Sequence, residues 1–176
     1  MKRLLSIAMM LLLTVSISEI YAQKTPASPR EKAEGKIDGV MVAVDYGSPA
    51  VKGREIWGGL EKYDVVWRAG ANATTAVTFK DAVEIGGELV EAGTYGLYII
   101  PRENDDWTVI INTDWDRDMH GAWGAYSYKE ENDVVRVDLT PEFVDENQER
   151  LSYSVKDGGI SFAWEKARLM LPIESN

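Results

Sequence analysis

Polar and apolar side chains alternate through most of the chain after residue 35, and this alternation limits the folds that the chain can adopt. In the run VMVAVDY, Val40, Val42, Val44 and Tyr46 fall on one face of an extended chain, and the run TTAVTF at 74–79 behaves in the same way. A period of two residues is typical of half-buried β-strands. Further short candidates, in chain order, are VEI, GTYGLYII, DWTVII, VVRVDL, LSYSV, ISFAW and ARLMLPI. The pattern therefore predicts a chain made mainly of strands.

Residues with turn chemistry separate these candidate strands. The runs IGGEL and KDGGIS predict tight hairpins, because glycine accepts the positive φ that two-residue loops require. No apolar period of 3.6 residues extends beyond about two turns, and the best helical candidate is a single turn near Pro141 and Glu142. About nine or ten short strands with such turns predict an all-β fold, an antiparallel β-sandwich or jelly-roll-like arrangement.

The first 22 residues have the layout of a secretory signal peptide. Two basic residues precede an apolar run from Leu4 to Val15, and small and polar residues then lead to Ala22. The alternative, a retained membrane helix, is disfavoured because the apolar run is too short to span a bilayer. We therefore expect a periplasmic or secreted protein. Residues 23–35 are expected to form an extended N-terminal lead-in, and residues 36–174 a single β-sandwich domain.

The composition excludes several classes of function. The chain has 29 acidic and 19 basic residues, giving a net charge of −10, and it has no cysteine. The acidic balance argues against nucleic acids and anionic membrane surfaces as partners. Without cysteine there is no thiol catalysis, no thiolate metal site and no lipid anchor on a cysteine. No cofactor is predicted, apart from the calcium ion considered below.

The run YDVVWRAGANATT at 63–75 contains the first candidate site. Residues 63–68 are expected to form a strand that places Val65 and Trp67 on the core side and Arg68 outside or in a crevice. One interpretation is purely structural, with Trp67 packing, Gly70 bending the chain and Asn72 capping the turn. In the other, Arg68 and Asn72 line a polar pocket, because a guanidinium beside an amide suits a carboxylate or sugar hydroxyls.

Two further runs add candidates to this pocket. VKGRE places Lys52 and Arg54 on one face if extended, either beside a ligand or as protection of an edge strand. WGAYSY places Trp123 and Tyr126 near glycine, where the rings can stack on a sugar or close one end of the sandwich. The predicted crevice is lined by Arg54, Trp67, Arg68 and Asn72, with Trp123 or Tyr126 at its rim.

Several runs together resemble a known family. They are SPR at 28–30, DYGSPAVKGREIWGGL, VVWRAGANATT, EAGTYGLYIIP, DWTVIIN and WGAYSY. Their order and spacing resemble a family of exported bacterial proteins, typical of the Bacteroidetes and catalogued as domain of unknown function 2911. The resemblance covers residues 27–172 and implies an all-β sandwich, but it implies no activity.

Acidic residues in the loop TDWDRDMHG suggest a calcium site. Asp114, Asp116 and Asp118 alternate, and carboxylate oxygens are the ligands that calcium prefers. The full calcium-loop pattern fails, because its glycine position holds Met119 and its final glutamate position holds Ala125. The competing interpretation is a solvated acidic loop.

Candidates for catalysis are few. The single histidine, His120, has no Gly-x-Ser-x-Gly nucleophile motif to accompany it. A pair of carboxylates can hydrolyse glycosides, but no spacing singles out two of them. The sequence favours a binding or envelope-associated module for a small polar, anionic or carbohydrate ligand. The alternatives are a hydrolase of glycosides or esters, through a carboxylate pair or bound metal, and a purely structural or protein-contact module.

Overall fold

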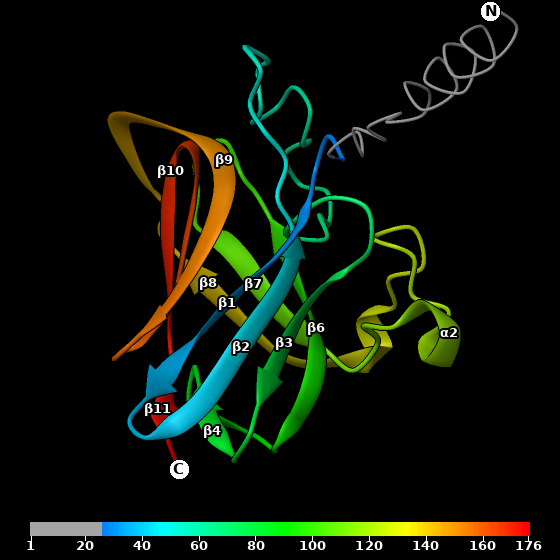
Figure 1. Cartoon of the computed structure of the whole chain (residues 1–176), viewed down its shortest axis with the longest axis vertical. Coiled ribbons are helices and arrows are strands. Elements are labelled where there is room, and N and C mark those ends of the chain that lie inside the picture. The colour runs from blue at the N-terminus through cyan, green and yellow to red at the C-terminus, as the bar shows by residue number, and fades with distance from the viewer. Residues whose placement is uncertain (1–25) are drawn as a thin grey trace, which may run out of the picture.

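The computed structural model describes residues 26–176, and this part of the chain is built almost entirely of antiparallel strands (Figure 1). The predicted signal peptide at 1–22 lies outside the described residues. The predicted all-β sandwich is confirmed. The elements are β1 Arg30–Ile37, β2 Val40–Gly47, β3 Thr75–Phe79, β4 Val83–Ile85, β5 Glu88–Val90, β6 Gly93–Ile100, β7 Trp107–Asn112, α2 Arg117–His120, η1 Glu130–Asn132, β8 Asp133–Leu139, β9 Glu142–Lys156, β10 Gly159–Pro172 and β11 Glu174–Ser175.

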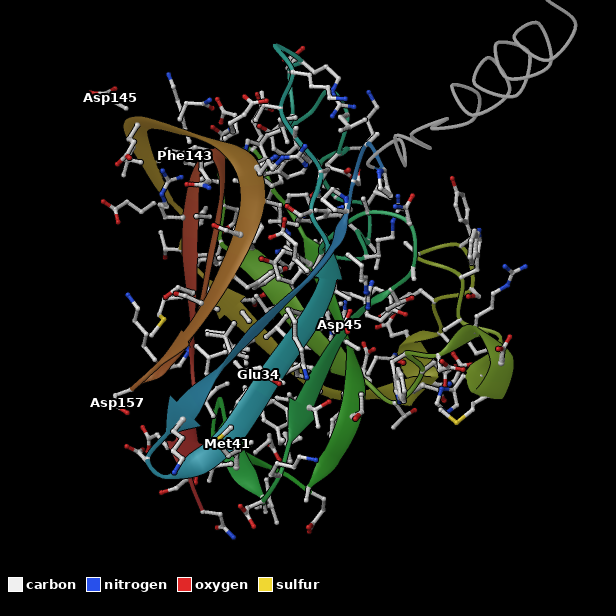
Figure 2. The ribbon with its side chains drawn as sticks, in the orientation of Figure 1. Glu34, Met41, Asp45, Phe143, Asp145 and Asp157 are labelled. Carbon is white, nitrogen blue, oxygen red and sulfur yellow. The ribbon has the colours of Figure 1, made fainter. Side chains whose placement is uncertain are left out.

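Six strands form the main sheet, in the order β1-β2-β3-β6-β7-β8. The alternation in β2 fixes which face is inside, since Val42 and Val44 are fully buried while Met41, which precedes them in the strand, is 40% exposed. Glu34, Met41 and Asp45 lie on the opposite, outer face of the β1–β2 pair (Figure 2). The predicted inward face of this strand is therefore confirmed.

The second layer consists of β9 and β10, which lie across the inner face of the sheet (Figure 1). β10 folds back on itself: the Ser161 hydroxyl lies 3.1 Å from the Met170 sulfur, and a Cβ on Gly159 would touch the Leu171 carbonyl oxygen. Glu165, at the bend, has a φ of 52°. β9 bends as well, with Asp145 at its bend (Figure 2). Because both strands double back, the continuous segment from β9 to β10 forms the whole layer that covers the six-stranded sheet.

The remaining strands form a small sheet in the order β11-β4-β5. Gly86 and Gly87 join β4 to β5 with φ values of 63° and 85°, and Asp157-Gly158 joins β9 to β10. Both predicted hairpins are confirmed. The helical turn expected near Pro141 and Glu142 is wrong, because β9 begins at Glu142.

β1 begins earlier than the sequence indicates. Arg30 pairs with Gly47, so the domain boundary predicted at residue 36 falls inside β1. The strand lies at the sheet edge, where its charged side chains face water and give no apolar period. β1 is held in place by close packing on β9, because a Cβ on Gly35 would come within 2.5 Å of the Val155 carbonyl oxygen.

Aromatic side chains fill one end of the core between the layers. Trp57 contacts Trp67, Trp107, Trp164 and Phe162, with ring centroids 4.5–6.2 Å apart. All five are buried. Over the described residues, no helix is long and apolar enough to cross a membrane.

Candidate functional site

Trp67 belongs to the core and does not line a crevice. Residues 63–68 do not form a strand; Trp67 alone pairs with Ile99, through backbone hydrogen bonds of 2.8 and 2.9 Å. The Trp67 side chain is 3% exposed, and its indole N–H donates to the Gly70 carbonyl oxygen at 3.1 Å. The predicted ligand-binding role of Trp67 is therefore wrong, because its ring is used in packing. Val65, expected on the core side, is 55% exposed, since Asp64 takes a φ of 61° and breaks the alternation.

The corner after Trp67 uses the turn chemistry that the sequence predicts. Asn72 has a φ of 65°, and its amide donates to the Ser28 carbonyl oxygen at 3.3 Å. A Cβ on Gly70 would come within 2.5 Å of the Thr75 hydroxyl. These contacts fix the backbone at 68–74 against β3, and they leave Asn72 exposed at the surface.

Arg68 lies between Trp67 and the turn at 70–72, and its side chain lacks hydrogen-bond partners in the described part of the chain. It is half-buried, its Nε is fully buried, and it makes no hydrogen bond or ion pair with any residue of the described part of the chain. Gly124 lies against it, since a Cβ there would come within 2.8 Å of the Arg68 Cδ and 3.4 Å of its Nη1. A charged group without an acceptor is costly to bury. Most other arginines have acceptors; these are Arg30, Arg54, Arg102, Arg136, Arg150 and Arg168.

Glu61 is the nearby acidic group that sequence reasoning missed. Burial raises the pKa of Glu61 from its ordinary value of 4.5 to about 7, and the charges of Arg68 and Arg54 act in the opposite direction. Its position is set by backbone hydrogen bonds to Ile56 and Gly58 in the long β2–β3 loop. Nothing in the local run GGLEKYD distinguishes it from an exposed glutamate, because its burial arises from the folding of the loop.

Arg54 is only partly available to a ligand. Its Nε donates to the Val51 carbonyl oxygen at 3.0 Å, and its Nη2 donates to Ala50. The guanidinium therefore stabilises its own loop, and its charge reaches the site through its effect on Glu61. Arg54 and Arg68 are thus related through Glu61, on which both charges act.

Trp123 and Tyr126 belong to the loop between β7 and β8, which also carries α2 (Figure 1). Gly124 lies against Arg68 and the Asn72 carbonyl oxygen, and its own carbonyl accepts from the Thr74 hydroxyl at 3.4 Å. Trp123 is 46% exposed and Tyr126 is 87% exposed. Gly124, which lies between Trp123 and Tyr126 in the sequence, therefore joins this loop to the corner that carries Arg68 and Asn72.

The comparisons with known proteins identify a family. The family described as "Protein of unknown function (DUF2911)" matches residues 28–173. The chain belongs to the DUF2911 family. This confirms the resemblance found in the sequence. No curated protein and no solved structure matches this DUF2911 protein.

The predicted calcium ligands of this DUF2911 protein do not converge. Asp116 is the N-cap of α2 and accepts from the backbone N–H groups of Asp118 and Met119, while Asp114 accepts from the Asn132 amide at 2.8 Å. Over residues 26–176, no three acidic, histidine or cysteine side chains are placed to hold a metal ion. The capping role of Asp116 thus occupies the central carboxylate of the predicted set, and calcium binding by Asp114, Asp116 and Asp118 stays a prediction.

Two grooves elsewhere on this DUF2911 protein lack the predicted residues. One of about 390 Å³ runs along β10, and one of about 360 Å³ adjoins it and shares Thr140. The first contains Arg168, whose guanidinium donates to the carbonyl oxygens of Glu146 and Glu165. Since that cation is already satisfied, the end of the sandwich around Arg68 is the better candidate site.

Proposed function

We propose that this DUF2911 protein is a binding module that takes a small anionic ligand on Arg68. The supporting observation is the half-buried guanidinium, whose Nε is fully buried without an acceptor in the described part of the chain. Gly124 lets the β7–β8 loop approach the cation closely, so one side of it is already covered.

The chemistry of Arg68 matches a carboxylate or phosphate. A guanidinium offers parallel N–H donors that fit two oxygens of such a group, and each charge-assisted bond is stronger in a partly buried place. A protein that retains an unpaired cation there forgoes stability, which is typical of a functional site. Glu61 limits the anion affinity while ionised, because its negative charge lies near the same guanidinium.

The proposal is tested by ligand-induced changes in melting temperature with acetate, succinate and phosphate. We expect at least one of them to stabilise the wild type and to have no effect on Arg68→Gln. Arg102→Gln is the matched control, because Arg102 is also partly buried but donates to the Asp106 carbonyl oxygen at 2.6 Å. Equal shifts in wild type and Arg68→Gln, or no shift with any of the three anions, would exclude the site and favour a structural module.

A second candidate function is hydrolysis of a glycoside or ester, and Glu61 is the observation that favours it. A carboxyl with a pKa of about 7 exchanges protons readily near neutral pH, as a general acid or base must. Release of nitrophenol from nitrophenyl glycosides and esters tests this function. Activity that follows the Glu61 titration and is lost in Glu61→Gln would support it; absence of turnover would exclude it for these substrates.

We also propose that the protein is exported to the periplasm or the medium. The support is the sequence of residues 1–22, with its basic start, short apolar run and small residues before Ala22. Cell fractionation followed by N-terminal sequencing of the exported form tests this. We expect the mature chain to start at or within a few residues of Gln23; retention in the cytoplasm would contradict it.

A further inference from the structure

A short β-turn that packs against Arg68 carries two aromatic residues, Trp123 and Tyr126. The Tyr126 N–H donates to the Trp123 carbonyl oxygen at 3.2 Å, so these residues stand at the two ends of the turn. The Trp123 N–H donates to the Ser127 hydroxyl at 2.6 Å, which fixes the turn further. Gly124, inside the turn, is the residue that lies against Arg68. The turn that carries both aromatic residues therefore packs against the unpaired guanidinium through Gly124.

The two rings differ in how much surface they leave free. The Arg117 guanidinium carbon lies 4.3 Å from the Trp123 ring centroid, so one face of that indole is covered and its orientation is stabilised. Tyr126 is 87% exposed, and within residues 26–176 its ring stacks on no aromatic or cationic group. Tyr126 therefore leaves its ring faces free for a ligand, on the turn that packs against Arg68.

Asn72 adds a hydrogen-bonding group to the same surface. Its amide nitrogen donates to the Ser28 carbonyl oxygen at 3.3 Å, which fixes the orientation of the amide. The amide oxygen makes no hydrogen bond within the part of the chain that the structure describes. It can therefore accept a hydrogen bond from a ligand hydroxyl.

These features together define one class of ligand. Building on the anion site proposed above, we propose that the ligand is an acidic sugar: a hexuronic acid, or a glycan that ends in one. Its carboxylate binds Arg68, an apolar C–H face of its ring packs on Tyr126, and a hydroxyl donates to Asn72. A simple carboxylate uses only the first of these contacts, and a neutral sugar uses only the other two.

Isothermal titration of the full chain with glucuronate, glucose and acetate tests this inference. We expect glucuronate to bind at least about tenfold more tightly than glucose or acetate, because only glucuronate makes both kinds of contact. The Arg68→Gln variant should bind neither glucuronate nor acetate. Tyr126→Ala should weaken the affinity for glucuronate by roughly threefold to tenfold and leave the affinity for acetate unchanged. Tyr126→Phe keeps the ring, so it should bind both ligands as the wild type does.

The outcomes separate the sugar from the anion site. If acetate binds as tightly as glucuronate and Tyr126→Ala changes neither affinity, the sugar inference is wrong and the anion site stands. The same conclusion follows if glucuronate does not bind while succinate or phosphate still binds through Arg68. If Arg68→Gln binds glucuronate as the wild type does, the proposed anion site itself is wrong.

Discussion

Gly124 lies directly against Arg68, with space for a hydrogen but not for a methyl group: a Cβ would approach the Arg68 Cδ to 2.8 Å. Gly124 also has a φ of 58°, which side chains disfavour. We expect Gly124→Ala to destabilise the protein by about 2–4 kcal/mol, through backbone strain and displacement of the arginine. Urea unfolding measures this loss.

Gly121→Ala is the control for that substitution. Gly121 has a similar φ of 68°, but a Cβ added there would meet no atom within 4 Å, so the variant carries backbone strain alone. We expect it to lose about 1–2 kcal/mol. Equal losses in the two variants would mean that the contact between Gly124 and Arg68 contributes nothing to stability.

Arg68→Gln should not destabilise the ligand-free protein. The substitution removes a half-buried charge that has no partner in the described structure, so we expect stability to stay equal or to rise by up to about 1 kcal/mol. Arg102→Gln, which loses a hydrogen bond to the Asp106 carbonyl oxygen, should cost about 1 kcal/mol. Chemical denaturation without ligand gives both values, and a larger loss for Arg68→Gln would reveal a structural role.

The titration of Glu61 makes stability depend on pH. Its pKa is raised from 4.5 to about 7 in the folded state, so the folded state holds this proton more tightly than the unfolded state does. Its contribution therefore becomes less favourable as pH rises from about 4.5 to about 7, and stays so above that range. Glu61→Gln should match the wild type near pH 4 and exceed it at pH 8 by on the order of 2 kcal/mol.

Glu88→Gln provides the control for loss of one negative charge, because Glu88 is exposed at the start of β5. Thermal unfolding of both variants between pH 4 and pH 8 gives the comparison. A constant difference between Glu61→Gln and the wild type across this range would show that Glu61 is not held in the low-polarity surroundings described above.

Removal of the two tryptophans predicted for the crevice should destabilise the protein to very different extents. Trp67 is 3% exposed within the aromatic core, so Trp67→Ala should cost about 3–5 kcal/mol. Trp123 is 46% exposed, and Trp123→Ala should cost less than about 1 kcal/mol. Denaturation midpoints followed by circular dichroism measure both, and similar costs would contradict the division between core and surface.

The sequence predicted the parts of the fold that depend on local pattern. In β2, the period of two identifies the buried face, and Gly86-Gly87 identifies a hairpin, because both depend on neighbouring residues. The charged strand β1 was missed because an edge strand needs no apolar alternation. The sequence of 63–68 resembles a strand, since the positive φ of Asp64 leaves no mark in an apolar run.

The candidate site was only partly predictable for a similar reason. Arg68, Asn72, Trp123 and Tyr126 stand out by residue type. The approach of the β7–β8 loop to the corner depends on the contact of Gly124 with Arg68, more than fifty residues earlier in the chain. Trp67 was placed in the site because an aromatic ring beside an arginine suits a ligand as well as a core. Glu61 was missed because a loop, and not a strand or helix pattern, removes it from water.

The doubled-back course of β10 has a consequence for synthesis. Phe162, Trp164, Leu169 and Leu171, all buried in the core, follow all six strands of the main sheet in the chain. Until that stretch is synthesised, the apolar side of the sheet lacks part of its cover, so a nascent chain cannot complete its core. Completion of the core therefore waits for the synthesis of β10.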